Sequence, residues 1–133
     1  MTTEVLGSSR TACAQPLWDS FDYSSNLGYS NPFEHLDYPA VAILPRIIKA
    51  VDGHDCVIIA GPTGSAKSSI VNLALMLHGY SVIDAQPTRL AAARLADWAA
   101  SLIGESVGER VGFRTALHRA ESWRTRLLYV TEE

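Results

Sequence analysis

The spacing of apolar residues changes along the chain and predicts where helices and strands lie. Residues 1–37 are rich in Ser, Asn, Tyr, Asp and Pro and show neither the helical nor the strand period. We expect residues 1–38 to form a flexible or partner-docking tail. From Pro39 to Val51, apolar positions recur at helical spacing, which predicts an amphipathic helix with Pro45 near its first turn.

Two strand-then-helix units follow this helix. The run Cys56–Ala60 is short, apolar and β-branched, and it predicts a buried parallel strand. Apolar positions over 68–78, followed by Gly79, predict a helix. Residues 81–85 predict the next strand, and residues 88–103 predict the next helix. One face of that helix carries Ala91, Leu95, Trp98 and Leu102. We expect Trp98 to be a core residue.

Two further strands are predicted over residues 110–114 and 126–130. Consecutive βα units imply a parallel sheet with helices packed on it. Sheets of this kind usually contain about five or six strands, so a sequence that ends soon after a core strand predicts an incomplete sheet. The expected fold is an α/β domain over residues 39–133 with an incomplete parallel sheet and flanking helices.

A glycine-containing loop joins the first predicted strand to its helix. Gly61–Ser68 matches the P-loop pattern G-x-x-x-x-G-K-[ST] at every fixed position except the second glycine, which is Ala66. A loop between a buried strand and a helix aims backbone N–H groups and the positive end of the helix dipole at phosphates. The sequence therefore predicts a site for a nucleoside triphosphate with Mg²⁺.

Each residue of this loop has an expected role that follows from its position. Lys67 should reach the β- and γ-phosphates, and the Ser68 hydroxyl should ligate Mg²⁺. The methyl group of Ala66 should alter the affinity or the loop geometry without abolishing binding. A glycine- and serine-rich turn without ligand is the alternative, and no catalytic side chain is assigned. The predicted ATP-phosphate contacts are Gly61, Thr63, Gly64, Ser65, Ala66, Lys67, Ser68 and Ser69.

Composition narrows the class of protein. Of the 133 residues, 47% are hydrophobic and 19% charged, as in an ordinary globular domain, and the net charge of −3 excludes an overall basic field. Any nucleic-acid contact would therefore depend on a local patch. Two scattered cysteines, with no signal peptide and no apolar run of membrane length, favour a cytoplasmic protein with no membrane partner.

Three segments together resemble superfamily 2 helicases of the DEAH/DExH type. Residues 62–68, Pro-Thr-Gly-Ser-Ala-Lys-Ser, are similar to helicase motif I, and residues 85–92, Ala-Gln-Pro-Thr-Arg-Leu-Ala-Ala, are similar to motif Ia. Residues 111–114 and 125–132 resemble the V-G-Y-x-x-R segment and motif Ib. The resemblance covers about residues 44–133. It implies a P-loop NTPase of RecA-like fold, represented by the N-terminal portion of the first lobe.

The resemblance also implies which groups are bound. Lys67 and Ser68 would serve ATP and Mg²⁺. The backbone of single-stranded RNA or DNA would be contacted by Thr88, Arg89 and Thr131. Thr88 stands where DEAH proteins have arginine. Thr88 and Arg89 have a simpler interpretation as the cap and the solvated start of a helix.

The acidic D-E-x-H box of the family, whose carboxylates hold Mg²⁺ and orient the attacking water, does not occur in this sequence, which contains no Asp-Glu pair. The second lobe with its arginine fingers is expected beyond Glu133. We therefore expect this chain, as a piece truncated before that box, to bind nucleotide weakly and to hydrolyse it poorly or not at all. The rest of a helicase core would be a further partner.

Other classes stay open. A AAA+ ATPase of the MoxR-like kind also tolerates alanine before the lysine, although it prefers proline at Thr63 and does not predict residues 86–89. A non-catalytic nucleotide-binding module would hold ATP without turning it over. A small P-loop kinase is a further class, although no lid or phosphoacceptor signature is visible.

The basic residues near the C-terminus also allow two interpretations. They form either a nucleic-acid patch or, because acidic residues alternate with them, a salt-bridged surface. The arginines are Arg110, Arg114, Arg119, Arg124 and Arg126, and the acidic residues are Glu105, Glu109 and Glu121.

Overall fold

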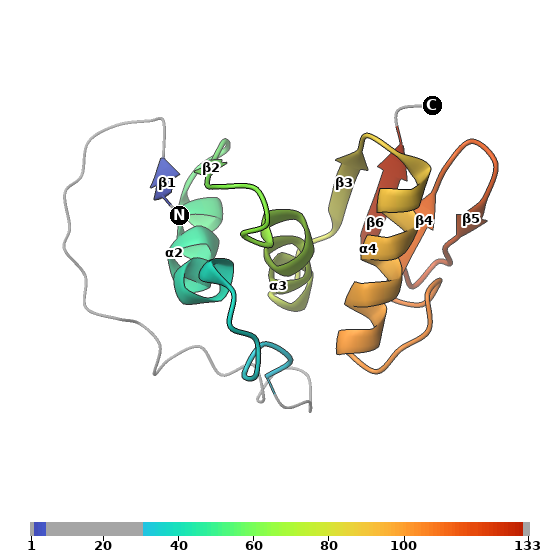
Figure 1. Ribbon diagram of the computed structural model, residues 1–133, viewed down its shortest axis with the longest axis horizontal. Coiled ribbons are helices and arrows are strands. Elements are labelled where there is room, and N and C mark those ends of the chain that lie inside the picture. Colours follow the sequence, from blue (N-terminus) through green and yellow to red (C-terminus); the bar gives the residue numbers. More distant parts are fainter. Residues whose placement is uncertain (1, 5–30, 132–133) are drawn as a thin grey trace. The chain divides into compact units, whose positions relative to one another are not determined.

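The computed structural model describes residues 2–4 and 31–131, which divide into two units, one ending at Lys67 and one beginning at Ser68. The first unit holds β1 (Thr2–Glu4), α2 (Pro39–Gly53) and β2 (Ile58–Ala60). The second holds a sheet with helices packed on it (Figure 1). Of the predicted tail, residues 1 and 5–30 lie outside the described residues, and the prediction for them is left as it was.

Helix α2 confirms the predicted amphipathic helix and extends two residues beyond it. Pro39 occupies its first turn, where a missing N–H leaves no intrahelical bond unmade. Pro45 lies inside the helix, so the prediction that it sits near the first turn is wrong. Phe33, which precedes the helix, is also buried. The apolar stripe is buried at Ala40, Leu44, Ile47, Ile48 and Ala50.

Strand β2 differs from the predicted strand in length, partner and burial. It covers only Ile58–Ala60 and pairs antiparallel with β1, with Thr3 opposite Ile59. Ile58 is 44% exposed, and Cys56 is an exposed free thiol. A strand that is apolar on both faces becomes buried only when strands flank it and layers cover both faces. Within residues 2–4 and 31–131 it has one partner strand, so the prediction of a buried parallel strand is wrong.

The second unit is built on a four-stranded sheet in the order β3-β6-β4-β5. The strands β3 (Val82–Gln86), β6 (Leu127–Thr131) and β4 (Val111–Arg114) are parallel. The short β5 (Arg119–Ala120) returns antiparallel to β4 at the edge of the sheet (Figure 1). The parallel sheet with flanking helices that the two βα units predict is therefore confirmed, and a hairpin extends it.

Helices cover one face of this sheet. Helix α4 (Arg89–Leu102) lies along β4, β6 and β3 (Figure 1). Helix α3 (Asn72–Leu77) contacts β3 and β6, and a π-helical turn over Lys67–Val71 leads into it. Tyr129 on the covered face is fully buried, whereas Ile83, of opposite parity, is 73% exposed. No helix within the described residues is long and apolar enough to cross a membrane.

Small side chains form the buried face of α4. The face expected to pack in the core includes Leu95 and Trp98, but both are only half-buried. The prediction that Trp98 is a core residue is therefore wrong. Alanine carries no side chain beyond Cβ, so this face lets the helix backbone approach the sheet closely. The fully buried positions are Ala92, Ala96, Ala99 and Ala100.

Candidate phosphate-binding site

The loop that follows β2 contains two residues in the left-handed conformation. Gly64 and Ala66 have positive φ angles of 80° and 62°, whereas Ser65 between them does not. A backbone that alternates in hand turns successive N–H groups toward one concave point. The left-handed conformation costs an L-residue about 1–2 kcal/mol and costs glycine almost nothing. Ala66 thus adopts a left-handed conformation that favours glycine, at the position where the P-loop pattern has glycine.

The Lys67 ammonium is folded back onto its own loop. Its Nζ donates to the carbonyl oxygens of Gly61 and Pro62, at 2.8 Å each, and to Oγ of Ser65 at 3.0 Å. Ser65 is buried, and its hydroxyl donates to the Pro62 carbonyl at 2.8 Å. All three ammonium N–H donors are therefore engaged by neutral oxygens. No carboxylate within the described residues forms an ion pair with Lys67.

Ser68 is the first residue of the second unit, and its side chain is exposed. Its carbonyl oxygen accepts from Nδ2 of Asn72 at 2.8 Å and from the Tyr129 hydroxyl at 3.3 Å. Its own hydroxyl makes no hydrogen bond to any residue that the structure describes. A hydroxyl oxygen is a hard ligand that suits Mg²⁺. The residue therefore fits the metal-ligating role that the sequence predicts, while its backbone is held by two side chains.

Tyr129, whose hydroxyl contacts Ser68, has polar neighbours on β3. Tyr129 is fully buried and lies opposite Asp84 in the register of β6 and β3, and Gln86 Nε2 donates to the Asp84 carboxylate. Burial raises the pKa of Asp84, and the Gln86 hydrogen bond partly offsets this rise. Burial, and secondarily the Asp84 charge, raise the pKa of Tyr129 well above its ordinary value. The Tyr129 hydroxyl therefore stays protonated and can donate a hydrogen bond to the Ser68 carbonyl oxygen.

A sequence signal for Tyr129 does exist. Leu127, Tyr129 and Thr131 alternate along β6, so a strand that buries Leu127 also turns the tyrosine hydroxyl inward. A buried hydroxyl requires a partner. Nothing in the strand itself identifies that partner, because the Ser68 carbonyl lies 61 positions earlier in the chain.

The three predicted nucleic-acid residues lie where the parallel strands end, at the carboxyl edge of the sheet. Strands β3 and β6 are adjacent and parallel, with Gln86 opposite Thr131, so the residues that end or follow them share the carboxyl edge. Thr88 is the N-cap of α4, and its Oγ1 accepts from the Ala91 N–H at 3.2 Å, as the capping interpretation expects. Arg89 is exposed. Oγ1 of Thr131 is buried and has no hydrogen-bond partner among the described residues.

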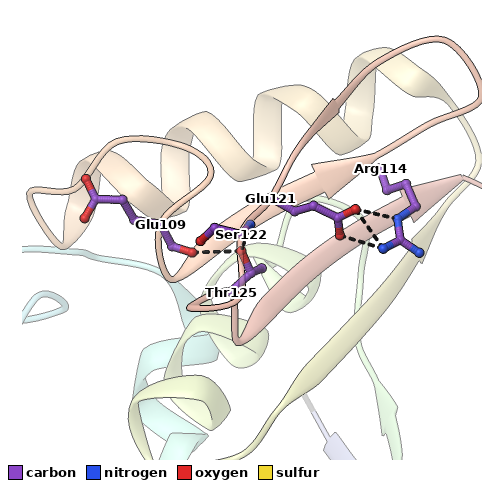
Figure 2. Close-up of polar contacts among 5 residues, drawn as sticks. All are labelled: Glu109, Arg114, Glu121, Ser122 and Thr125. Carbon is purple, nitrogen blue, oxygen red and sulfur yellow. Dashed lines mark hydrogen bonds and ion pairs between the residues drawn. The ribbon is translucent and has the colours of Figure 1, made fainter.

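The arginines near the C-terminus divide into two groups. Arg110 Nε forms an ion pair with Glu105 at 2.7 Å. Arg114 donates from both Nε and Nη2 to Glu121, at 2.8 Å each (Figure 2). The interpretation as a salt-bridged surface is therefore confirmed for Arg110 and Arg114, whereas the nucleic-acid patch stays a prediction for the other arginines. The arginines that are exposed and pair with no carboxylate of the described residues are Arg119, Arg124 and Arg126.

The mostly parallel sheet with its covering helices matches a fragment of a helicase RecA-like fold. The chain is similar to the ATP-dependent RNA helicase HrpB of Escherichia coli K12, with 36% identity over 97 residues, which are 71% of this chain and 12% of that protein. Two solved structures, of the E. coli DEAH/RHA helicase HrpB and the E. coli DExH-box NTPase HrpB, each match 71% of the chain at 36% identity with a TM-score of 0.66. No protein-family model matches.

The matched part of the chain is thus homologous to a DEAH/DExH helicase, and the resemblance inferred from the three motifs is confirmed. The chain spans 12% of the length of the HrpB chains that it matches.

Proposed function

We propose that this chain binds the phosphates of ATP together with Mg²⁺ through Gly61–Ser69, as part of an ATP-dependent nucleic-acid helicase of the DEAH/DExH type. The observation that carries this proposal is the state of Lys67. Its ammonium group donates hydrogen bonds to three neutral oxygens of a loop in which Gly64 and Ala66 have positive φ angles. No described carboxylate forms an ion pair with it. The homology to HrpB favours a helicase over the AAA+ and kinase alternatives.

Phosphate binding by this loop requires a change in one set of hydrogen bonds. The three donors of Lys67 are all engaged, so a phosphate oxygen must replace Gly61, Pro62 or Ser65 as a partner. An anionic phosphate is a stronger acceptor than a neutral carbonyl or hydroxyl, which favours this exchange. The exposed Ser68 hydroxyl would hold Mg²⁺, which neutralises phosphate charge when bound.

We expect a polypeptide of these 133 residues to hydrolyse ATP slowly if at all. Attack by water on the γ-phosphate needs a group that orients the water and carboxylates that hold the metal. The sequence contains no Asp-Glu pair that could supply them. Binding without turnover also describes the non-catalytic module, so slow hydrolysis by itself does not distinguish the two alternatives.

The carboxyl edge of β3 and β6 is the proposed site for the nucleic-acid backbone. Arg89 is exposed there, and the N-terminus of α4 places the positive end of a 14-residue helix at the same edge. Thr88 still has a hydroxyl proton to donate while its oxygen caps the helix. Contacts of this kind grip phosphates without reading the base sequence.

The experiment that tests ATP binding compares the only two lysines of the chain. Lys67→Ala removes the proposed phosphate contact, whereas Lys49→Ala removes an exposed lysine of α2 and serves as the matched control. Hydrogen bonds to charged groups contribute about 1.5–3 kcal/mol, so Lys67→Ala should weaken binding of a fluorescent ATP analogue with Mg²⁺ at least about tenfold. Circular dichroism should show the fold unchanged.

Equal affinity for the wild type and Lys67→Ala would contradict the proposal, as would the absence of any binding by the wild type. Phosphate release by the wild-type polypeptide would be measured in the same samples. Rapid turnover would leave ATP binding intact but would overturn the expectation of slow hydrolysis.

A further inference from the structure

We propose that the turn Ser122–Thr125, together with Arg126, is a second binding surface for single-stranded nucleic acid, in which Trp123 stacks on a base. Trp123 is 92% exposed. A single exposed apolar residue needs no explanation. Here, however, the exposed indole belongs to a turn held by hydrogen bonds and is followed by arginines that pair with no described carboxylate, and none of these residues belongs to the proposed ATP site.

The turn is held by the hydroxyl of Thr125 (Figure 2). Oγ1 of Thr125 donates to the Glu109 carbonyl at 2.8 Å and accepts from the Ser122 N–H at 2.9 Å. The Thr125 N–H donates to the Ser122 carbonyl at 3.1 Å, which closes the turn. Arg126 N–H then donates to the Arg110 carbonyl at 2.8 Å, which attaches the turn to β4. Trp123 is thus presented to solvent by fixed backbone.

The charge around the turn is positive. Both carboxylate oxygens of Glu121 are engaged by Arg114. The carboxylate of Glu109 is directed away from Thr125 in Figure 2, and only its backbone carbonyl meets the turn. Arg124 and Arg126 are exposed and pair with no carboxylate of the described residues. Two arginines that no described carboxylate neutralises therefore follow Trp123 within three positions of the chain.

A single strand of nucleic acid fits this surface better than a protein does. Base stacking needs one open aromatic face, and phosphates need nearby cations, which is what Trp123 and the two arginines offer. A protein partner needs a wide and complementary interface, whereas the turn Ser122–Thr125 offers a single exposed indole. Bases in a duplex are already stacked, so the expected ligand is single-stranded.

The surface lies at the other end of the sheet from the proposed backbone contacts of Thr88 and Thr131. Arg126 precedes β6, and its Nη1 donates at 3.0 Å to Oγ of Ser81, which precedes β3. Thr131 ends β6, about 16 Å farther along a strand that rises about 3.3 Å per residue. The Trp123 turn therefore marks the amino edge of the sheet, and binding there is separate from binding at the carboxyl edge.

The test measures the anisotropy of a fluorescein-labelled single-stranded oligonucleotide of mixed sequence, titrated with the whole 133-residue chain in the absence of nucleotide. Stacking on an aromatic side chain contributes about 1–3 kcal/mol per base, so Trp123→Ala should weaken binding about tenfold. Trp123→Phe should restore most of this loss. Arg124→Gln should weaken binding about threefold and lower the slope of log affinity against log salt by about one.

Arg94→Gln is the matched control, since it removes an exposed charge from α4 in the same unit and should leave the affinity unchanged. The effect of Trp123→Ala should disappear with a duplex of the same sequence. The proposal is overturned if the wild type does not bind the oligonucleotide or if Trp123→Ala binds it equally well. Trp123-dependent binding of a polyglutamate peptide, with oligonucleotide binding unaffected, would replace it by a protein surface. Because no nucleotide is present, failure of the ATP site would not affect these results.

Discussion

Different kinds of contact stabilise the loop of the first unit and the sheet of the second unit. In the loop, every hydrogen bond of Lys67 is made within six positions of the chain. In the sheet, the stabilising contacts join distant residues, such as Tyr129 with Ser68 across 61 positions and Thr125 with Glu109 across 16. A short motif is therefore enough to shape the loop, whereas the sheet depends on strands brought together from afar.

Strand β2, which precedes the loop, differs from β6 in the number of strands that flank it. Its apolar run could be buried between parallel strands, yet within the described residues it pairs with β1 alone and leaves Ile58 nearly half exposed. In the second unit β6 has β3 on one side and β4 on the other, and Leu127 and Tyr129 are fully buried. Burial of a strand thus follows from its neighbours and not from its own hydrophobicity.

The largest expected effect tests the long-range packing of the sheet. At Gly112, an added Cβ would come closer to the Ala120 carbonyl oxygen than van der Waals contact allows, and 3.3 Å from Cα of Glu121. Because backbone must move to relieve this clash, Gly112→Ala should lower the free energy of unfolding by about 2–3 kcal/mol. Urea denaturation of the chain measures it. In the control Gly53→Ala nothing lies within 4 Å of the new Cβ, and a loss as large there would undermine the packing argument.

A smaller effect tests a long-range contact that reaches the phosphate loop, the hydrogen bond from Tyr129 to Ser68. Tyr129→Phe keeps the buried ring but removes the hydroxyl that donates to the Ser68 carbonyl. A hydrogen bond of this kind contributes about 1 kcal/mol, so affinity for a fluorescent ATP analogue with Mg²⁺ should fall about fivefold. Because Tyr129 would act by positioning the residue that holds the metal, the loss should nearly vanish in EDTA. An equal loss with and without Mg²⁺ would show that Tyr129 does not act through Ser68.

The next effect tests the local shape of the loop. Ala66 holds a φ of 62°, which glycine adopts without strain. Ala66→Gly should therefore raise the free energy of unfolding by about 0.5–1 kcal/mol, after allowing for the greater freedom of glycine in the unfolded chain. Thermal melts of the two proteins measure this. Ala60→Gly, in β2 with an ordinary φ, should instead destabilise, and a gain at both positions would contradict the argument from the left-handed conformation.

The smallest effect concerns the charge of Asp84 beside Tyr129. Burial raises the pKa of Asp84 in the folded state above the unfolded value of 3.8, so the folded state holds the proton more tightly. Ionisation of Asp84 therefore opposes folding, and this cost grows as the pH rises through the folded pKa. Asp84→Asn, whose amide oxygen can still accept from Gln86, should stabilise the protein at pH 7 and lose this advantage toward about pH 4. Melting temperatures across this range measure it, and a difference that does not depend on pH would point to another cause.

Periodicity predicted most helices and strands of the second unit, although not β5, because these elements carry their own local signals. Thr88 begins α4 as its N-cap, Gly104 follows the helix with a φ of 69°, and β3 and β6 lie within a residue or so of their predicted positions. The face of α4 was misjudged because helical spacing alone gave preference to Trp98 and the other large residues. Contact with the sheet instead selects the alanine stripe one position away, where the backbone can come close.

The candidate site divides in the same way. The roles expected of Lys67 and Ser68 come from a motif of eight residues and stay predictions. The contact of Tyr129 with Ser68 and the braced turn under Trp123 could not be predicted, because each depends on residues that only the folded sheet brings together. Local chemistry is readable from such a sequence, whereas its long-range support is not.

The most direct test of the central claim is a titration of ¹⁵N-labelled protein with ATP and Mg²⁺, followed by the amide resonances. Phosphate binding in the loop should shift the N–H signals of Gly64, Ser65, Ala66, Lys67 and Ser68 and leave the signals of β4 and β5 unchanged. Lys67→Ala should lose these shifts under the same conditions. Shifts that are confined to other parts of the chain, or that persist in Lys67→Ala, would contradict the assignment of this loop as the ATP site.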